Sequence, residues 1–503
     1  MNWTIKYRAH RGLKGWVRGL AALVVCLALF LFFQLTIPYH FYHREQTSLF
    51  LWAWSDWMPW LMAPGALAEW MGRCLTQFYY YELMGPLIVA LLLTAWGAGV
   101  LTLTRPYLKR WSWLLAAALL LWEAGRCCVL SYPLSGTVAL TGWVWSLCGL
   151  RALWRRRSDH PLLSALLLFL LLIGSGLAWG SGSWHVMSGR PDRALERTLA
   201  IDCDYYFGRH QRLYPLLEEE QREGNVQMAA YYSYLLHASE GTLPQHLMTH
   251  YRAGEKGLFL PVDPSSSYFT IYAANEVWFS LGDYTMAEHA AMLGMIFSPS
   301  HRSGRALKRL AEINLIQGDE AAAMKYLRML SHTIPYRRWA RQRMTNSRTE
   351  AVELWLTQRR KALPAGDTLR LGYDIPTSLR HLLQSTQSDY LRQMQLDYLL
   401  CYDLMRKDVR GFGRDYLAYC GAKTPTGIYA EGMMIYLSME PEAIQNPQVA
   451  GWQLDERQLA QFRDYTERYK AGQGMDSELQ TRYGDTYWFY FHFAQRKGGN
   501  DEN

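Results

Sequence analysis

The sequence has 503 residues, of which 50% are hydrophobic and 19% are charged, and its formal net charge is +8 at pH 7. A chain of this length has room for about three domains of ordinary size. The positive charge does not indicate a nucleic-acid-binding protein, because much of it stands in short clusters beside apolar segments, where membrane topology accounts for it.

Residues 1–189 hold nearly all the long apolar runs and predict a transmembrane domain. A spanning helix needs about 20 apolar residues. The run from Gly19 to Ile37 has no charge and is closed by Pro38, and it is too long for the apolar core of a cleaved signal peptide. Apolar segments of this kind predict about five spans, near 19–37, 84–104, 111–132, 136–153 and 162–182.

The distribution of lysine and arginine predicts the topology. Twelve of these residues stand in the N-terminal tail and in the 105–110 and 151–157 turns, whereas the opposite side has three. Because cytoplasmic loops carry an excess of positive charge, we expect a cytoplasmic N-terminus and, with five spans, an external C-terminal region. In a bacterium this means a multi-pass protein of the inner membrane with a periplasmic C-terminal domain.

An interfacial outer loop, 38–83, joins the first two expected spans. Its indole-rich stretch predicts contact with the lipid headgroups through Trp52, Trp54, Trp57 and Trp60. Before this stretch stands a polar cluster that includes His43, Arg44 and Glu45.

This layout has some similarity to integral-membrane glycosyltransferases that use lipid-linked sugar donors. The similarity implies a carboxylate base, Glu45 or Asp56, that deprotonates an acceptor hydroxyl, and Arg44 as the partner of the donor phosphate. Such enzymes have many more spans, and their usual acidic pair is absent here. Interfacial anchoring is therefore the favoured alternative for these residues.

Charged and small residues mark the later expected spans. Glu123 and Arg126 stand three residues apart on one helix face, and a charge inside a membrane is a candidate for function because its burial is costly. We favour the alternative that they pair with each other at the outer interface and anchor the helix. Gly176 and Gly180 form a small-xxx-small face, which predicts close packing within the bundle or in an oligomer.

From Pro191 onward the pattern is helical, and two units punctuated by Gly-Asp repeat 36 residues apart. Glycine permits a turn between two helices, a small residue five positions later permits close packing, and proline stops the second helix. The spacing is near the ~34 residues of a tetratricopeptide repeat, although the consensus Trp is absent. The repeat-packing positions in these units and a weaker third one are Gly224, Ala229, Gly282, Ala287, Pro299, Gly318, Ala323 and Pro335.

These features predict an all-α protein with an N-terminal transmembrane helix bundle followed by a tetratricopeptide-like α-solenoid. We expect the transmembrane domain over 1–189, helical repeats over 190–340, an irregular connection over 341–385 and a C-terminal helical region over 386–503. The last region includes a helical hairpin around Lys407-Asp408. A solenoid of this kind presents a concave surface to a partner.

The external half shows no recognisable catalytic set. His246 and His250 share a helix face, but the Glu of an HExxH motif and a third ligand are missing, so no metal site is expected. Asp202 and Asp204 are interpreted as solvated surface acids. No cofactor is expected. Two of Cys203, Cys401 and Cys420 could form one disulfide, and the sequence does not decide between the possible pairings.

Near its end the chain reads YGDTYWFYFHF, and seven of the eleven residues from Tyr483 to Phe493 are aromatic. Asp485 or Thr486 is a suitable N-cap, which predicts a short helix from Thr486 to Gln495. Because the rings cover more than one face, we favour burial as a structural latch. Sugar binding with Asp485 and His492, and docking on the membrane or on the tryptophan-rich loop, are the alternatives.

Three stretches, HREQTSLF, PGALAEWMGRCLTQFYYY and YGDTYWFYFHF, carry a resemblance to an uncharacterised family of bacterial multi-pass membrane proteins with tetratricopeptide-like C-terminal domains. The resemblance covers most of the chain. It implies an architecture and an inner-membrane location, and no catalytic residue comes with it.

We therefore predict a non-enzymatic scaffold of the cell envelope that contacts membrane lipid and recruits a protein partner through its helical repeats, with no role in nucleic-acid binding. The alternative is a membrane transferase acting on lipid-linked glycans through the first outer loop. Its candidate catalytic residues are His43, Arg44, Glu45, Glu123 and Arg126. A transporter fits less well, because inverted repeats are not evident.

Overall fold

The computed structural model describes residues 2–53, 58, 66–155, 186–223, 226–261, 268–298, 300–363, 374–471 and 477–494. Every regular element in these ranges is a helix, which confirms the prediction of an all-α protein. Several predicted features lie outside the described residues, namely the fifth span with Gly176 and Gly180, the repeat positions Gly224 and Pro299, and the indole residues Trp54, Trp57 and Trp60.

The chain divides into two compact units that do not follow a single cut at residue 189. Unit 1 comprises 1–199, 295–308 and 324–348, and unit 2 comprises 200–294, 309–323 and 349–503. Two short stretches of the expected tail thus belong with the N-terminal domain. Four helices contribute residues to both units: α9 (Arg193–Tyr206), α14 (Tyr284–Phe297), α15 (Gly304–Gln317) and α16 (Glu320–Ser331).

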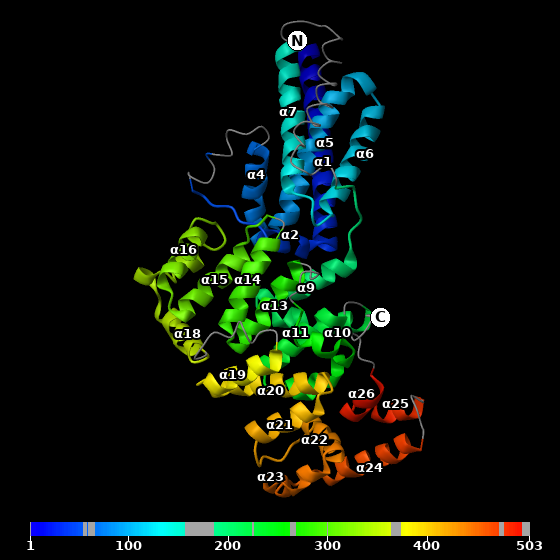
Figure 1. Cartoon of the computed structure of the whole chain (residues 1–503). Coiled ribbons are helices and arrows are strands. Elements are labelled where there is room, and N and C mark those ends of the chain that lie inside the picture. The colour runs from blue at the N-terminus through cyan, green and yellow to red at the C-terminus, as the bar shows by residue number, and fades with distance from the viewer. Residues whose placement is uncertain are drawn as a thin grey trace, which may run out of the picture. The chain divides into compact units, whose positions relative to one another are not determined.

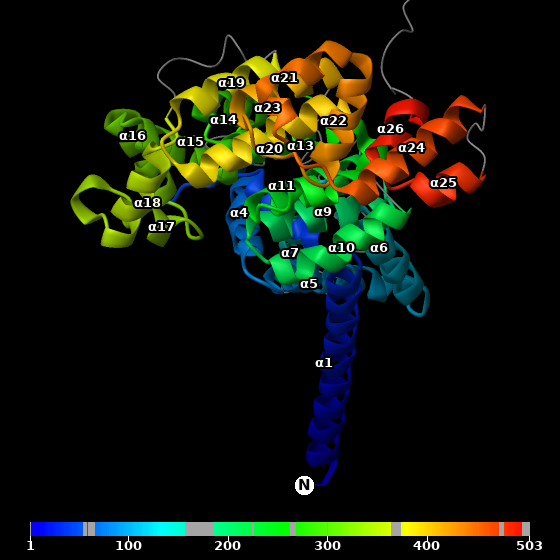
Figure 2. The same ribbon diagram turned by 90° about the horizontal axis from the view of Figure 1, so that it is seen from below.

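Unit 1 is a helix bundle in which α5 lies beside α1, α6 and α7 (Figure 1). The 35-residue α1 is seen along its length in Figure 2. The elements that lie wholly within this unit are α1 (Asn2–Thr36), α2 (Pro38–Gln46), α4 (Ala66–Thr76), η1 (Gln77–Tyr80), α5 (Met84–Leu108), α6 (Trp111–Cys127), α7 (Leu134–Arg155), α17 (Arg337–Arg341) and η4 (Thr345–Ser347).

Among the described residues, two helical stretches are long and apolar enough to cross a membrane, Trp16–Thr36 of α1 and Met84–Leu108 of α5. They coincide with the first two predicted spans. Helices also occupy the third and fourth predicted spans, but α6 has only 17 residues and α7 ends in a basic turn with Arg151 and Arg155. The structure therefore supports membrane association through two helices, and the number of five spans stays a prediction.

The break between α1 and α2 has a local cause. Proline at 38 disfavours helical geometry at the preceding residue, and Ile37 has φ −145° and ψ 47°. The same proline suits the first turn of α2, where its missing N–H costs nothing. Behind this corner the buried rings of Phe33, Phe41 and Tyr79 form the core with residues of α5, α6 and α7.

Unit 2 contains the remaining helices, of which the longest, α20, has 17 residues. They are α10 (His210–Glu223), α11 (Val226–Ser239), α12 (Leu243–His246), η3 (Leu247–Gly257), α13 (Tyr268–Leu281), α18 (Glu350–Arg360), α19 (Ile375–Ser385), α20 (Asp389–Met405), α21 (Val409–Tyr419), α22 (Ile428–Met439), η6 (Pro441–Gln445), α23 (Pro447–Ala450), α24 (Glu456–Lys470), α25 (Ser477–Tyr483) and α26 (Tyr487–Phe493). Figure 2 shows α24, α25 and α26 grouped together, and contacts join α24 to α25 and α25 to α26.

The predicted Gly-Asp turns share one geometry. Gly282 and Gly318 have φ values of 85° and 86°, the left-handed region that glycine adopts most easily. The following aspartate caps the next helix in both turns: Oδ1 of Asp283 accepts the N–H of Met286 at 3.0 Å, and Oδ1 of Asp319 accepts the N–H of Ala322 at 2.9 Å.

The turn around Lys407 uses the same device without glycine. Lys407 has φ 59°, and Oδ1 of Asp408 accepts the N–H of Gly411 at 2.9 Å. Backbone bonds close this turn as they close the one at Gly282: Asp283 donates to Trp278 at 3.0 Å and Asp408 donates to Asp403 at 2.9 Å. The predicted hairpin around Lys407-Asp408 is therefore confirmed.

The stretch 341–385 differs from the expected irregular connection, because it contains α18 and α19. The prolines and glycines that suggested irregularity have a second meaning. Pro376 stands in the first turn of α19, where proline favours a helix start. Pro364, Gly366 and Gly372 lie outside the described residues.

Candidate functional site

The polar residues of α2 form a buried cluster, here called the α2 cluster and comprising His40, His43, Arg44, Glu45 and Gln46. Exposed fractions are 3% for Glu45 and 1% for Gln46, and Arg44 is partly buried. Burial of this many polar groups needs hydrogen-bond partners. The cluster is thus not an open interfacial anchor, and its two sides find their partners in different parts of unit 1.

One side of α2 meets the connection that follows α6. Nη2 of Arg44 donates to the carbonyl of Val129 at 2.6 Å, and Nε donates to that of Leu130 at 3.3 Å. Burial, together with the neighbouring charges of Arg44 and His43, holds the pKa of His40 well below its usual value. The two hydrogen bonds of Arg44 mean that its guanidinium group binds carbonyl oxygens of its own chain.

The other side of α2 meets the two tail stretches that belong to unit 1. The hydroxyl of Tyr336 donates to Oε2 of Glu45 at 3.1 Å. Nη1 of Arg305 donates to Oε1 of Gln46 at 3.1 Å, and Oγ of Ser303 donates to the Gln46 carbonyl at 2.7 Å. Sequence reasoning missed Tyr336 and Arg305, which stand 291 and 259 residues beyond their partners.

Glu45 is the one carboxylic acid of the α2 cluster. Burial raises its pKa to about 8, although the Tyr336 hydrogen bond and the charge of Lys308 oppose the rise. A carboxyl in this range can hold or release a proton near neutral pH, which is what general acid–base chemistry requires.

A further carboxylate, Glu196, stands at the N-terminus of α2. Its Oε1 accepts the N–H of Tyr39 at 2.6 Å. Helix N-termini carry a partial positive charge and unpaired N–H groups, so a carboxylate is stabilising there. Burial nevertheless raises the pKa of Glu196 to about 7. The free N–H groups behind Pro38 were visible in the sequence, but their acceptor, 157 positions away, was not.

Glu123 and Arg126 pair with each other, as we favoured, but inside unit 1 and not at an exposed interface. Both side chains are fully buried, and Nη1 of Arg126 donates to Glu123 at 3.1 Å. Oε1 of Glu123 also accepts the hydroxyls of Tyr132 at 2.6 Å and Thr137 at 2.7 Å. The guanidinium lies 4.2 Å from the Tyr132 ring centre, and Nε donates to the Val186 carbonyl at 3.1 Å.

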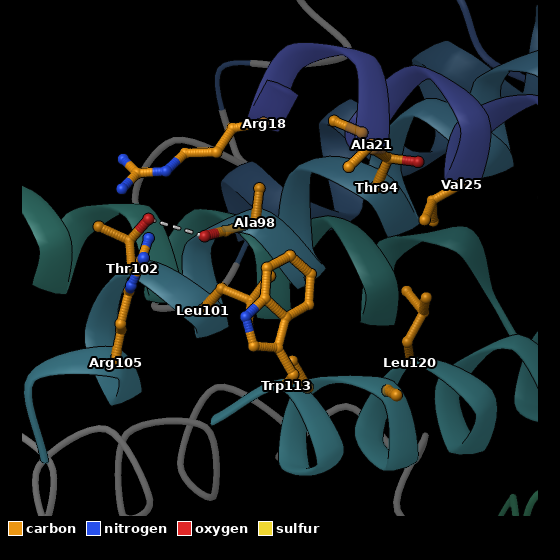
Figure 3. A pocket seen from close by; sticks show the side chains of 14 residues that line it. Arg18, Ala21, Val25, Thr94, Ala98, Leu101, Thr102, Arg105, Trp113 and Leu120 are labelled. Carbon is orange, nitrogen blue, oxygen red and sulfur yellow. Dashed lines mark hydrogen bonds between the residues drawn. The ribbon is translucent and has the colours of Figure 1, made fainter. Parts of the chain in front are cut away.

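The five candidate residues of the transferase hypothesis do not line the cavity that lies between α1, α5 and α6. This cavity of unit 1 has a volume of about 270 Å³ and is lined by residues of these three helices (Figure 3).

Of the four predicted interface tryptophans, Trp52 is described. Its side chain is 37% exposed, and its ring packs against Phe50 and Trp70. Its backbone N–H donates to the His332 carbonyl at 2.7 Å. The nearby Gln77 bridges the same two segments, since Nε2 donates to the Phe50 carbonyl and Oε1 accepts the N–H of Ile334. The outer loop thus contacts its own chain here.

Histidines of unit 2 form a stacked pair without metal-site geometry. The rings of His237 and His246 lie 3.7 Å apart and parallel within 2°. No group of three or more His, Cys, Asp or Glu residues suited to a metal occurs in the part of the chain that the structure describes. All eight cysteines are free, including Cys203, Cys401 and Cys420.

Two acids of unit 2 differ from the prediction, and a third acid was not singled out in the sequence. Asp202 and Asp204 are buried, with exposed fractions of 1% and 0%, so the interpretation as solvated surface acids is wrong. The hydroxyl of Tyr232 donates to Asp202. The third acid is Asp403. Burial and the neighbouring Asp415 carboxyl raise the pKa of Asp403 to about 8.

The aromatic segment, 483–493, is buried within unit 2 and forms the predicted helix. Thr486 is the N-cap of α26, and its hydroxyl accepts the N–H of Phe489 at 3.3 Å. Four consecutive side chains of the helix have exposed fractions of 6% or less, namely Tyr487, Trp488, Phe489 and Tyr490. Sugar binding, which needs exposed rings, is not favoured by this arrangement.

Polar atoms of the aromatic segment bind the end of α20 and the start of α22. The hydroxyls of Tyr487 and Tyr490 donate to the carbonyls of Leu404 at 3.0 Å and Met405 at 2.6 Å. Nε1 of Trp488 donates to the Glu431 carbonyl at 3.2 Å. The last carbonyls of α20 are thus satisfied by tyrosines, as helix C-termini require.

Comparison with known proteins gives one family. The sequence matches a family of unknown function (DUF6057) over residues 14–189 and 160–494. No curated protein and no solved structure matches the sequence. Because the two matched segments extend over most of the 503 residues, the chain belongs to this family of unknown function, DUF6057.

Proposed function

We propose that the protein is a scaffold of the bacterial inner membrane, with a cytoplasmic N-terminus and a periplasmic tetratricopeptide-like domain that recruits a protein partner. The observation that carries this proposal is the recurring turn of the tail. Two Gly-Asp turns and one Lys-Asp turn each have a residue in the left-handed conformation followed by an aspartate that caps the next helix. Repetition of one helical unit is typical of solenoids, which work by binding partners.

The buried small residues support a repeat architecture. Ala229, Ala287 and Ala323 stand at the predicted packing positions, and each has an exposed fraction of 0%. In the repeat around Gly282, Nδ2 of Asn275 on α13 donates to the Ala287 carbonyl on α14, so the two helices of this repeat are in contact. A side chain larger than alanine would separate them.

The basic residues of unit 1 support the proposed topology. Arg18 of α1 and Arg105 of α5 line one cavity, and Nη1 of Arg151 on α7 donates to the Leu103 carbonyl at 2.9 Å. One residue of each predicted cytoplasmic cluster therefore lies at the same end of the bundle. This is the arrangement that a positive-inside orientation requires.

The α2 cluster also favours a structural role over catalysis. Arg44, Glu45 and Gln46 each have a hydrogen-bond partner within unit 1. Charged groups that a donor phosphate would need are thereby engaged by carbonyl and hydroxyl groups of the chain. The cluster joins the outer loop to the tail stretches of the same unit.

Photo-crosslinking in living cells tests the scaffold. A crosslinking amino acid is placed at the exposed apolar positions Leu354, Met439 and Ile444 of unit 2, whose exposed fractions are 60%, 46% and 55%. The exposed polar positions Gln358 and Gln461 serve as controls. We expect the same protein to be captured from at least two of the apolar positions. Its capture from Met439 and Ile444 should be lost when Leu354→Asp is introduced into the same chain. Equal capture from the control positions, or none at all, would contradict the proposal.

Reporter fusions test the topology. Alkaline phosphatase fused after residue 200 should be active and a cytoplasmic reporter at the same place inactive. The opposite pattern would place the tail in the cytoplasm and refute the periplasmic assignment.

A second candidate function, transfer from a lipid-linked donor, is favoured by one observation: Glu45 is a buried acid that can exchange a proton near neutral pH. Glu45→Gln keeps an acceptor for Tyr336 and removes the titratable group. If this variant and Arg44→Ala abolish the function in vivo while Leu354→Asp does not, the transferase replaces the scaffold.

A further inference from the structure

The cavity between α1, α5 and α6 described above is an elongated groove in unit 1 (Figure 3). Its volume is about 270 Å³, and fourteen residues line it. Six of the fourteen are alanine or glycine, which leave room between the helices because their side chains are short. These six are Ala21, Ala22, Gly97, Ala98, Ala116 and Ala117.

The groove is polar at one end and apolar along its length. Arg18, Arg105 and Thr102 gather at one end in Figure 3, while Val25 and Leu120 stand at the other. The order along each helix agrees with this picture. The antiparallel α1 and α5 bring the first lining residue of one beside the last lining residue of the other.

The two arginines are exposed and, among the described residues, neither side chain has a hydrogen bond or an ion pair. This contrasts with Arg151 at the same end of the bundle, whose guanidinium donates to the Thr102 and Leu103 carbonyls. Two guanidinium groups that have no partner among the described residues, at the mouth of one groove, are suited to a phosphate, because each can offer it two parallel N–H donors.

The length of the groove fits one leaflet of a bilayer. From Thr94 to Arg105 the lining of α5 extends over 12 residues, whose 11 rises make roughly 16 Å of helix. Half of a hydrocarbon core about 30 Å thick is about 15 Å. Trp113, which also lines the groove and is 52% exposed, is of the residue type that prefers the headgroup level.

The neighbouring surface of α1 is also suited to lipid. Leu20, Leu23 and Val24 are 63%, 64% and 58% exposed. An apolar helix surface of this kind is stable in hydrocarbon and not in water.

We propose that this groove binds one acidic phospholipid of the leaflet on the Arg18–Arg105 side. The phosphate lies between the two guanidinium groups, and one acyl chain runs along Ala98 toward the bilayer centre. The lipid would fill the space between α1 and the α5–α6 pair. An acidic headgroup is preferred because a zwitterionic one would bring an ammonium group toward two arginines.

The proposal rests on the membrane location proposed above, but its test does not depend on topology. The full chain is purified in a neutral detergent and titrated with phosphatidylglycerol or with phosphatidylcholine of the same acyl chains. Native mass spectrometry then measures the fraction of protein that retains one lipid. We expect at least a tenfold preference for phosphatidylglycerol.

Substitution of the arginines should remove that preference. Arg18→Gln combined with Arg105→Gln should weaken phosphatidylglycerol binding about 10- to 100-fold and phosphatidylcholine binding much less, so that the preference is lost. Replacement of both by lysine, which keeps the charge and loses the two parallel donors, should give an intermediate affinity. The matched control, Lys109→Gln with Arg110→Gln, changes two exposed basic residues that do not line the groove.

Ala98→Phe tests the acyl-chain position, because the ring fills the groove without altering charge. It should abolish retention of both lipids, whereas Leu91→Phe on the exposed side of α5 should not. If Ala98→Phe does not fold, the exposed arginine variants decide alone.

Three results would overturn the proposal: equal retention of the two lipids by the native chain, native-like binding by the Arg18–Arg105 variant, or an equal loss in the control variant. The last would indicate a nonspecific lipid layer. The second result, combined with a loss of binding in Ala98→Phe, would indicate an apolar groove without headgroup selectivity. None of these results bears on the crosslinking and fusion tests of the scaffold.

Discussion

The α2 cluster and the aromatic segment are both short stretches of unusual composition that resemble ligand sites in the sequence, and both are buried in the structure. The nine-residue α2 buries carboxyl, imidazole and amide groups, whereas the seven-residue α26 buries rings. In α2 the polar groups need partners from distant segments of unit 1. In α26 the rings supply apolar area, and their hydroxyl and N–H groups reach backbone carbonyls of unit 2.

This difference bears on energy as well as on geometry. Burial of an aromatic side chain is strongly favourable, and its hydrogen bonds to carbonyls do not depend on pH in the neutral range. Burial of a carboxyl is costly, and the cost changes with its protonation. We therefore expect α26 to contribute more stability than α2, and α2 to contribute the stronger pH dependence.

The largest effect is expected from Trp488→Ala. Its side chain is fully buried, and truncation of such a ring costs about 3–5 kcal/mol. Amide hydrogen exchange on the full chain should show α24 to α26 opening more easily by this amount. Asp485→Ala, at an exposed position beside the helix, is the control. Unchanged protection in Trp488→Ala would mean that the segment is not a structural latch.

The effect of Glu45→Gln on the free energy of unfolding should depend strongly on pH. Because the pKa of Glu45 is raised to about 8, the folded chain keeps this proton between about pH 4.5 and 8, while the unfolded chain releases it. The native chain therefore loses stability as the pH rises through this range, and the glutamine variant does not. Relative to pH 5, the variant should gain about 2–4 kcal/mol on the native chain at pH 8.

Chemical denaturation of both chains at the two pH values measures this difference. Other acids with raised pKa values, such as Glu431 at about 7 and Asp403 at about 8, cancel when the native chain is subtracted. Glu442→Gln, at an exposed position, should show no such trend. A pH-independent difference for Glu45→Gln would remove the proposed contrast between α2 and α26.

Lys407→Met should have a smaller effect, about 2 kcal/mol. Its ammonium group donates to the carbonyls of Phe491, at 2.8 Å, and Ala494, and it lies 5.2 Å from the Tyr490 ring centre. Loss of charge-assisted bonds accounts for the cost. Lys407→Gly should lose about 1 kcal/mol less, because glycine relieves the left-handed backbone at this position.

Hydrogen exchange in α26 measures both Lys407 variants, and Lys470→Met at the exposed end of α24 is the control. Equal losses in the methionine and glycine variants would show that the left-handed backbone at this turn carries no cost.

The smallest effect is expected from Asp319→Ala, which removes an exposed helix cap and should cost about 1 kcal/mol. Asp319→Asn keeps an acceptor and should behave almost like the native chain. Exchange protection in the first turn of α16 measures both. If asparagine and alanine are equally harmful, the cap is not the cause.

Local features were predictable from the sequence because their causes lie within a few residues. The turns at Gly282 and Gly318, the break before Pro38 and the Thr486 cap all follow from short-range backbone chemistry, and the structure contains each of them. The first two apolar spans were predictable because length and hydropathy are properties of one segment. The connection at 341–385 was not, because proline both ends and begins helices.

The burial of the α2 cluster was decided by tertiary structure alone. A sequence shows that Glu45 and Gln46 are polar, which favours exposure, but it does not show that Tyr336 and Arg305 reach them from 291 and 259 positions away. The same holds for Lys407, which takes a glycine's place in a turn while its ammonium group binds carbonyls of the aromatic segment. Local patterns determine helices and turns, whereas the burial of a polar group depends on whether the fold supplies a partner for it.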